Sequence, residues 1–345
     1  MKRYKRILAT QTGGWIGDMI LLTPTLRALR HAYEDAHITM LVRPLVVQLM
    51  TDNPYADELM IYDKRGEDKG ILKLLSLSRR LRELQFDLAV VLHPNSLRSA
   101  LIPCLARIPE RIGTRINGRG IFLTDSLSDR YDIHEVERYL RVLELIGISN
   151  TEHRLEFWHT MEDQRIVERI LAEYGISNSD IVVGVNPGTT WETKRWPLER
   201  FAEVIDVILR KFNARVVLTG SPAEKPLGDR LKELTSKGFV NLIGETDLRQ
   251  LGALIERMNL YLTCDSGPMH IAAAVNTPTI ALFGPTSPIR HAPYGDGHVV
   301  IQKQIECNPC YKRTCRRNYE CMKAIEVKEV LQHIEQRFSQ LSIVV

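Results

Sequence analysis

Short apolar segments alternate with amphipathic segments along the whole chain, and the alternation begins anew near the middle. The first series predicts strands at Arg6–Thr10, His37–Val42, Glu58–Tyr62, Phe86–Leu92 and Arg111–Ile112, and helices at Met19–Tyr33, Ser96–Ala106 and Glu135–Ile146. The second predicts strands at Ile181–Val185, Arg215–Leu218, Val240–Ile243, Leu260–Thr263 and Thr279–Phe283, and helices at Gln164–Tyr174, Leu198–Phe212, Lys225–Leu234, Leu248–Arg257, from Met269, and at Val327–Phe338. This pattern is typical of an α/β fold, in which helices connect the strands of a parallel sheet.

The restart of the pattern predicts two domains, and a length of 345 residues suits two. No Pro/Gly/Ser-rich linker marks the join, so we place the boundary by the restart, with domains at residues 1–155 and 156–345. Doubly wound domains of this kind bind ligands beyond the carboxyl ends of their strands. We therefore expect the active site between the domains.

Charge and hydropathy exclude several classes of protein. A formal net charge of +4 is too mild for a dedicated nucleic-acid-binding protein. The apolar run after the basic start Met1–Arg6 is too short for a signal peptide, and no run reaches the roughly 18 apolar residues that span a bilayer. We expect a cytoplasmic protein.

The first predicted strand runs into a glycine-rich turn, Gln11-Thr-Gly-Gly-Trp-Ile-Gly-Asp18. Glycines at such a turn let the backbone approach a ligand closely. Asp18 is at the start of the next helix, where it is a candidate general base or a simple helix cap. A dinucleotide-binding site is disfavoured because the spacing is not G-x-G-x-x-G and the second strand ends without an acid at Val42-Arg43.

Three turns of the second half carry groups that suit a nucleotide diphosphate. The first, Asn186-Pro-Gly-Thr-Thr-Trp-Glu-Thr-Lys194, offers hydroxyls and a cation to phosphate oxygens. The second, Asp265-Ser-Gly-Pro-Met-His270, begins a helix whose N-terminal amides attract anions. The third, Thr219-Gly-Ser-Pro-Ala-Glu224, places an acid where it could bind ribose hydroxyls. His270 is equally well explained as a satisfied helix histidine, and Glu224 as a surface acid.

Two clusters of residue types allow more than one interpretation. Basic residues outnumber acids between Arg98 and Arg119, so this segment is either an anion-binding surface or a solvated face; its members are Arg98, Arg107, Arg111, Arg115 and Arg119. Four cysteines crowd into a short segment, where they either bind a structural zinc ion or remain reduced thiols; they are Cys307, Cys310, Cys315 and Cys321.

Together these motifs make the chain resemble the ADP-heptose:lipopolysaccharide heptosyltransferases of glycosyltransferase family 9 over essentially its full length. The resemblance rests on Gly17-Asp18 with Pro24-Thr-Leu-Arg-Ala-Leu-Arg30, on Asn186-Pro-Gly-Thr-Thr with Lys194-Arg-Trp-Pro197, on Asp265-Ser-Gly-Pro-Met-His270 and on Phe283-Gly-Pro-Thr-Ser-Pro288. It implies the GT-B architecture, two Rossmann-like domains facing across a cleft, with the acceptor and the catalytic base in the first domain and the nucleotide sugar in the second.

The resemblance also implies roles for individual residues. Asp18 corresponds to the general base of an inverting displacement, and Lys194 assists departure of the ADP. The donor contacts of the family fall on Thr189, Thr190, Lys194, Glu224, Asp265, Ser266, Gly267 and His270. Where some members have threonine this chain has Ser266, which keeps the hydroxyl. No Asp-x-Asp motif is present, so we expect catalysis without a metal cofactor.

The partners implied are ADP-heptose and the lipid-linked inner core of lipopolysaccharide, with peripheral contact at the cytoplasmic face of the inner membrane. Cations of the Arg98–Arg119 segment and of Lys2–Arg6 are candidates for binding the anionic acceptor. Three alternatives stay open: a GT-B enzyme with a different donor or an epimerase, a non-catalytic sugar-nucleotide-binding protein, and, more distantly, a dinucleotide oxidoreductase.

Overall fold

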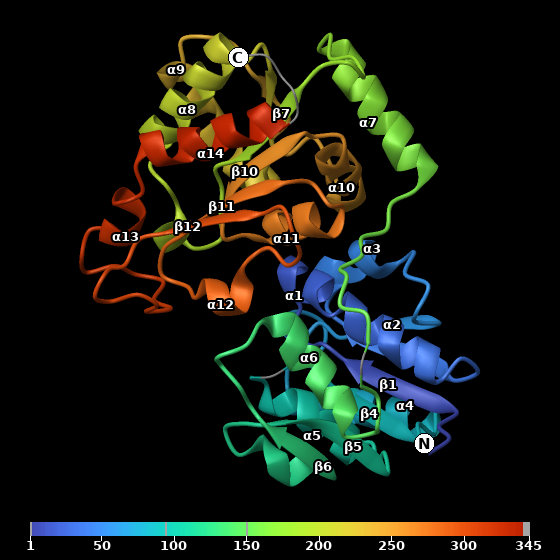
Figure 1. Ribbon diagram of the computed structural model, residues 1–345. Coiled ribbons are helices and arrows are strands. Elements are labelled where there is room, and N and C mark those ends of the chain that lie inside the picture. The colour runs from blue at the N-terminus through green and yellow to red at the C-terminus, as the bar shows by residue number, and fades with distance from the viewer. Residues whose placement is uncertain (1, 94, 150, 341–345) are drawn as a thin grey trace. The chain divides into compact units, whose positions relative to one another are not determined.

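A computed structural model describes residues 2–93, 95–149 and 151–340 of the chain (Figure 1). The chain folds into two compact units, Met1–Trp158 and His159–Val345. The division falls just after the boundary predicted at residue 155. Each unit contains one six-stranded sheet in which every pair of neighbouring strands is parallel.

The first sheet has the order β3-β2-β1-β4-β5-β6. Its strands are β1 (Arg6–Thr10), β2 (His37–Val42), β3 (Glu58–Ile61), β4 (Leu88–Val91), β5 (Glu110–Arg115) and β6 (Asp125–Ser128). The helices are α1 (Ile16–Leu21), α2 (Thr23–Ala32), α3 (Val47–Met50), α4 (Ile71–Glu83), α5 (Leu97–Leu105) and α6 (Glu135–Glu144). Apolar side chains of α4 and α5, among them Leu77 and Ile102, form one core with Leu8, Leu41 and Ala89 of the sheet. Helices α2 and α6 contact each other.

The second sheet has the order β12-β11-β10-β7-β8-β9. Its strands are β7 (Val182–Asn186), β8 (Arg215–Leu218), β9 (Val240–Asn241), β10 (Leu260–Cys264), β11 (Thr279–Phe283) and β12 (Val299–Gln302). The helices are α7 (Met161–Glu173), α8 (Leu198–Lys211), α9 (Lys225–Leu234), α10 (Leu248–Glu256), α11 (Gly267–Ala274), α12 (Pro288–His291), α13 (Glu320–Lys323) and α14 (Val327–Gln340). Counted within its own unit, each sheet therefore has the strand order 3-2-1-4-5-6 of a doubly wound Rossmann fold.

The final helix of the second unit, α14, contributes apolar side chains to the core of that unit. Phe212 at the end of α8 stacks on Phe338 of α14 with ring centroids 4.5 Å apart. Val330 and Ile334 of α14 are buried in the same core as Val185 and Phe201. Helix α14 thus packs on the side of the second sheet on which α8 lies.

The predicted helix Met19–Tyr33 is wrong in one respect, because the structure has two helices there. Helix α1 ends before Leu22, and α2 begins at Thr23 with Pro24 in its first turn. Proline has no N–H to donate and disfavours helical backbone in the residue before it, so one continuous helix through this position is unfavourable. The actual start at Ile16 also places Asp18 inside the first turn of α1.

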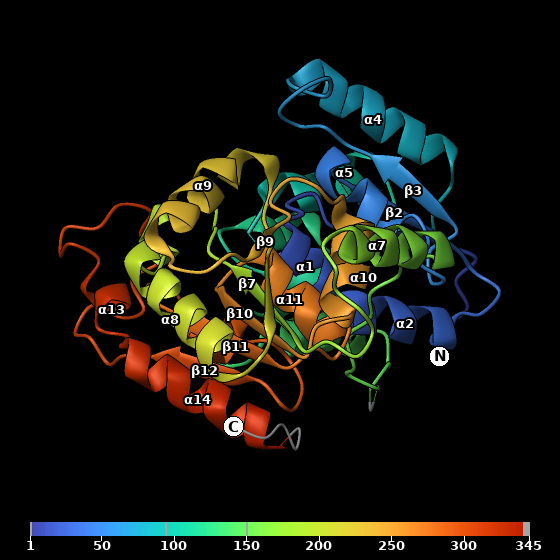
Figure 2. The ribbon, with the colours of Figure 1, turned by 90° about the horizontal axis from the view of Figure 1, so that it is seen from above.

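Several elements were not predicted from the sequence, namely α3, α4, β6, α12, β12 and α13. Helix α4 is the longest of them, and Figure 2 shows it at one flank of the first unit. Within the described residues, no helix is long and apolar enough to span a membrane.

Candidate active site

The strand order identifies where a ligand site is expected in each unit. A doubly wound sheet binds ligands at the point where the strand order reverses, beyond the carboxyl ends of the two central strands. In the first sheet this point lies between β1 and β4, and in the second between β7 and β10. The loops that follow these four strands carry Asp18, His93, Lys194 and Asp265 respectively.

The loop after β1 holds Asp18 at the start of α1. One carboxylate oxygen of Asp18 accepts a hydrogen bond from the Trp15 backbone N–H at 3.3 Å, so Asp18 does cap its own helix. The long distance makes this a weak cap, and the carboxylate is half-buried rather than enclosed. Arg43, after β2, donates to the Gly13 carbonyl at 3.1 Å and lies over the Trp15 ring, which fixes the loop from the neighbouring strand.

Tyr139 of α6 contacts this loop through Gln11, and the charge of Asp18 affects its pKa. The Gln11 amide donates to the Tyr139 hydroxyl at 3.2 Å, and the Gln11 amide oxygen accepts from the Gly13 N–H at 3.3 Å. Burial, followed by the charges of Asp18 and Glu135, raises the pKa of Tyr139 well above its usual range. The phenol therefore stays protonated near the carboxylate.

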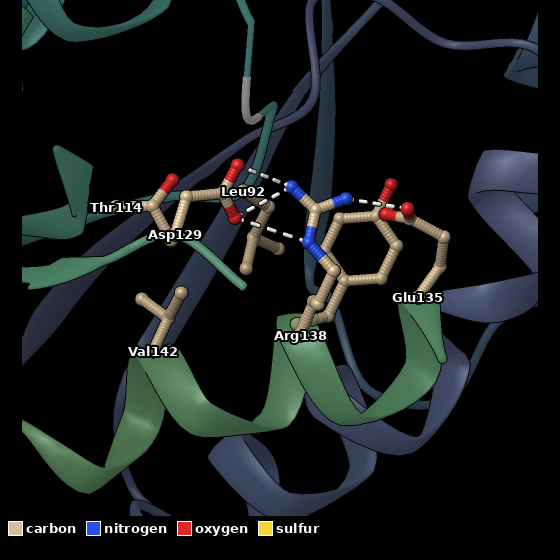
Figure 3. A pocket seen from close by; sticks show the side chains of 7 residues that line it. Leu92, Thr114, Asp129, Glu135, Arg138 and Val142 are labelled. Atoms are coloured by element: carbon tan, nitrogen blue, oxygen red, sulfur yellow. Dashed lines mark hydrogen bonds and ion pairs between the residues drawn. The ribbon is translucent and has the colours of Figure 1, made fainter. Parts of the chain in front are cut away.

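One turn of α6 carries a buried ion-pair network (Figure 3). The Arg138 guanidinium donates to both oxygens of Asp129, each at 2.6 Å, and also pairs with Glu135. All three side chains are at most 5% exposed. Thr114 and Leu92 line the same small pocket. The network fixes α6, and with it Tyr139, to Asp129 at the carboxyl end of β6.

His93, after β4, packs directly against the glycine turn after β1. A Cβ atom built on Gly13 would lie 1.8 Å from His93 Nε2, so only glycine fits there. The backbone N–H of Asn95 donates to His93 Nδ1 at 3.1 Å, which assigns the ring proton to Nε2. Burial, followed by the nearby Lys64 and Arg119 cations, lowers the pKa of His93 to about 4. His93 is therefore neutral at physiological pH.

In the second unit, Lys194 from the loop after β7 forms an ion pair with Asp265 from the loop after β10. Lys194 Nζ lies 2.6 Å from Asp265 Oδ2, and the Thr286 hydroxyl donates to the same oxygen at 2.5 Å. Burial would raise the pKa of Asp265, but Lys194, His291 and Thr286 outweigh it and hold that pKa below its usual value. Asp265 is therefore an anion, and it holds the Lys194 ammonium beyond the carboxyl ends of β7 and β10.

Glu224 reaches the same region from the loop after β8. Its carboxylate accepts from the backbone N–H and the hydroxyl of Ser221 at 2.7 and 2.8 Å. A Cβ on Gly188 would lie 2.0 Å from Glu224 Oε1, so a glycine is required after β7 for this approach. The structure thus brings Glu224 next to the Gly188-Thr189 turn, although the two are far apart in sequence.

The other predicted donor residues lie in the same two loops. Thr189 is buried and its hydroxyl accepts from the Trp191 N–H at 3.0 Å, while Thr190 is exposed. Ser266 precedes α11, Gly267 is its first residue and His270 is buried in its second turn. Trp191 adds an aromatic ring 4.7 Å from Lys194 Nζ. The sequence-predicted donor set therefore gathers at one edge of one sheet.

The predicted acceptor arginines do not gather in this way. Arg98 is in the first turn of α5 and Arg115 ends β5, so both are at the carboxyl edge of the first sheet, with Asp18. Arg107 and Arg111 are at the amino end of β5, the opposite edge. Arg119 is buried and donates to Thr114 and to the His93 carbonyl, which makes it structural.

The stretch Lys2–Arg6 also leads into the amino edge of the first sheet, where Lys2 pairs with Glu110 at 2.7 Å. Other cations approach the carboxyl edge, where Arg43, Arg65 and Arg98 add to burial in lowering the pKa of Lys64. Arg43 was missed because it stands alone in the sequence, and Lys64 because it and Arg65 lie among the acids Asp63, Glu67 and Asp68.

The structure does not support zinc at the cysteine cluster. In the described ranges no three His, Cys, Asp or Glu side chains are placed to hold a metal ion. Cys321 is buried in the apolar core, and the Cys315 sulfur accepts from the backbone N–H groups of Arg317 and Tyr319. All six cysteines, including Cys307 and Cys310, are free thiols.

A Lys194→Met substitution should weaken ADP binding on the order of 10- to 100-fold, because it removes a charge-assisted contact. It should also cost roughly 3 kcal/mol of stability, the lower end for a broken buried ion pair, since Asp265 loses its cation but keeps the hydrogen bond from Thr286. The double substitution Lys194→Met/Asp265→Asn should recover stability but not ADP affinity. Calorimetric titration and denaturant unfolding measure the two effects, and unchanged ADP affinity in Lys194→Met would contradict the assignment.

Two Rossmann-like units, one with a carboxylate and the other with a cation and a helix N-terminus at the reversal of strand order, define a glycosyltransferase of the GT-B class. The model of glycosyltransferase family 9 (heptosyltransferase) matches residues 74–320. The chain belongs to that family.

Individual relatives and solved structures cover between 81% and 99% of the chain. Lipopolysaccharide heptosyltransferase 3 of Escherichia coli is 31% identical over 287 residues, 81% of this chain and 82% of that protein. A family 9 glycosyltransferase from Veillonella parvula has a TM-score of 0.89 at 29% identity and covers 99% of both chains. The ADP-heptose heptosyltransferase II of E. coli has a TM-score of 0.79 at 27% identity, over 98% and 99% of the two chains.

Proposed function

We propose that this chain transfers heptose from ADP-heptose to the inner core of lipopolysaccharide, with inversion at the anomeric carbon and without a metal cofactor. The observation that carries the proposal is the meeting of Lys194, Asp265, Glu224 and the start of α11 at one edge of the second sheet. The structure of the E. coli heptosyltransferase II names ADP-heptose, and a nucleotide diphosphate sugar of this kind suits a site with these groups. Family membership and similarity to lipopolysaccharide heptosyltransferase 3 support the acceptor.

Asp18 is the general base of this proposal. Its carboxylate takes the proton of the acceptor hydroxyl as that oxygen forms a bond to the anomeric carbon of the heptose. The bond from this carbon to the ADP phosphate oxygen breaks at the same time, and the electron pair leaves with ADP. Attack from the side opposite the leaving group inverts the configuration. A positioned carboxylate contributes typically about 10²- to 10⁴-fold to such a step.

The second unit supplies the charge that stabilises departing ADP. Lys194 is the cation for the diphosphate, and the N–H groups at the start of α11, with the Ser266 hydroxyl, are its hydrogen-bond donors. The Glu224 carboxylate accepts hydrogen bonds from the ribose hydroxyls of the donor, because a carboxylate is an acceptor and a sugar hydroxyl can donate. Because the positive charge comes from Lys194 and the helix, transfer should be unaffected by a chelator.

The anionic acceptor is expected to bind cations at the carboxyl edge of the first sheet. A double substitution Lys64→Gln/Arg98→Gln should raise the acceptor KM on the order of tenfold and reduce its salt dependence, while the donor KM stays unchanged. The matched control is Lys2→Gln/Arg107→Gln, which removes two cations at the opposite edge and should leave both KM values unchanged. Equal effects of the two pairs on the acceptor KM would argue against this binding site.

The test of the proposed function is direct transfer. The purified protein is incubated with a heptose-deficient lipopolysaccharide core and with ADP-heptose, a UDP-hexose or ADP-glucose, and the product mass is measured. A mass gain of one heptose from ADP-heptose alone, in the presence of chelator, is expected. Transfer from another donor, epimerisation of the donor without transfer, or no reaction with any donor would each reject the proposal.

A further inference from the structure

Large apolar side chains are exposed at several places in the described part of the first unit; they are Trp15, Leu45, Ile61, Ile71, Leu72, Leu75, Leu97, Ile121 and Tyr131. Five of them end a strand or lie between a strand and the first turn of the helix that follows it, namely Trp15, Leu45, Ile61, Ile71 and Leu97. These five are therefore on the side of the carboxyl edge of the first sheet, the edge that carries Asp18. Exposed apolar side chains that cluster mark interaction sites.

The densest part of this edge is the amino-terminal half of α4. Ile71, Leu72 and Leu75 are 62%, 77% and 47% exposed. They lie within about 100° of the helix circumference, because each residue of a helix advances by about that angle. On the other side, Leu74, Leu77 and Leu81 are buried in the core of the unit. Helix α4 thus has one apolar face that packs on the sheet and a second that faces outward.

Basic residues border the outward apolar face. From Lys69 to Arg82 the chain has five basic residues and no acid; they are Lys69, Lys73, Arg79, Arg80 and Arg82, and all are exposed. An amphipathic helix with apolar side chains beside lysines and arginines binds the interface of a bilayer that contains anionic lipids. The charge of α4 complements such headgroups, whereas a second copy of this chain would bring like charges together.

We infer that Ile71, Leu72 and Leu75, with Lys69 and Lys73, form a docking surface for an anionic lipid bilayer, which we call the α4 surface. The inference rests on the proposed function, since it gives the lipid-linked acceptor a reason to meet this edge. Helix α4 follows β3, so its first turn lies at the carboxyl edge, with Asp18. A bilayer seated on the α4 surface presents the acceptor headgroup to the edge that holds the base.

The test measures how the full-length protein partitions onto vesicles of phosphatidylethanolamine and phosphatidylglycerol, with phosphatidylcholine vesicles for comparison. The wild type should bind the anionic vesicles. The triple substitution Ile71→Gln/Leu72→Gln/Leu75→Gln should lower the partition coefficient on the order of tenfold or more. Glutamine keeps helix propensity, and all three positions are exposed, so the fold is retained. Met161→Gln, at a 65% exposed methionine of the second unit, is the matched control and should have no effect.

Charge is tested separately with Lys69→Gln/Lys73→Gln, which should weaken binding and reduce its salt dependence. A wild type that does not bind anionic vesicles, or a triple variant that binds as the wild type does, would overturn the inference. So would sedimentation equilibrium showing that the wild type self-associates and the triple variant does not, because the occupant would then be a second copy. Transfer of heptose to a delipidated core oligosaccharide by the wild type is measured in parallel. A wild type that transfers heptose but does not bind anionic vesicles rejects only the α4 surface, and a wild type that binds these vesicles but does not transfer heptose rejects only the proposed function.

Discussion

An Asp18→Asn variant should bind ADP as the wild type does but lose on the order of 10²-fold or more in kcat, because only the proton acceptor is removed. Asparagine keeps an oxygen that can accept from the Trp15 N–H, so the start of α1 is retained. Single-turnover kinetics with ADP-heptose and a soluble core acceptor measure the effect.

A matched control is available in the second unit. Asp247 caps α10 by accepting from the N–H groups of Arg249 and Gln250, each at 2.9 Å. Asp247→Asn should therefore leave kcat unchanged. If Asp18→Asn also keeps near-normal turnover, Asp18 only caps its helix and another group accepts the proton.

Arg138→Ala should destabilise the first unit by roughly 3–5 kcal/mol, the typical cost of removing one partner from a buried ion pair. Asp129 and Glu135 would then remain as buried carboxylates without their guanidinium. Denaturant unfolding measures the loss. A shift within 1 kcal/mol of the wild type would show that water or another cation compensates the two acids.

Arg130→Ala is the control for this experiment. Arg130 pairs with Asp132, but the two side chains are 48% and 67% exposed, so the pair is screened by solvent. Exposed pairs contribute little to stability, so the unfolding midpoint of this variant should match that of the wild type. The contrast between the two arginines, which lie close together in sequence, isolates the effect of burial.

The buried strands could be predicted from sequence because parallel strands covered on both faces are continuous apolar runs. Strands β1, β2, β8 and β11 have the predicted bounds. Strand β6 was missed because Leu127 is its one apolar residue. Helix α4 was missed because its outward Leu72 and Leu75 obscure the helical periodicity of the buried leucines.

That the loops after β7 and β10 lie together could be predicted, because these strands are neighbours in a parallel sheet. The donor-binding roles of their residues, which the family resemblance implies, stay predictions. Which groups pair was not predictable: the sequence does not show that Asp265 neutralises Lys194, or that Glu224 lies against Gly188. Tyr139 and Arg138 were missed because they are ordinary members of an amphipathic helix, and only packing places them beneath the Asp18 loop.

The ion pair between Lys194 and Asp265 bears on the end of the catalytic cycle. Because Asp265 pairs with Lys194, a diphosphate that binds Lys194 as proposed would exchange one anionic partner for another and gain less than it would from an isolated cation. The Asp265 carboxylate is positioned to pair with the Lys194 ammonium again as ADP leaves. An enzyme with this ion pair binds its donor less tightly, but it also releases its product more readily. ADP should therefore be a modest inhibitor rather than a tight one.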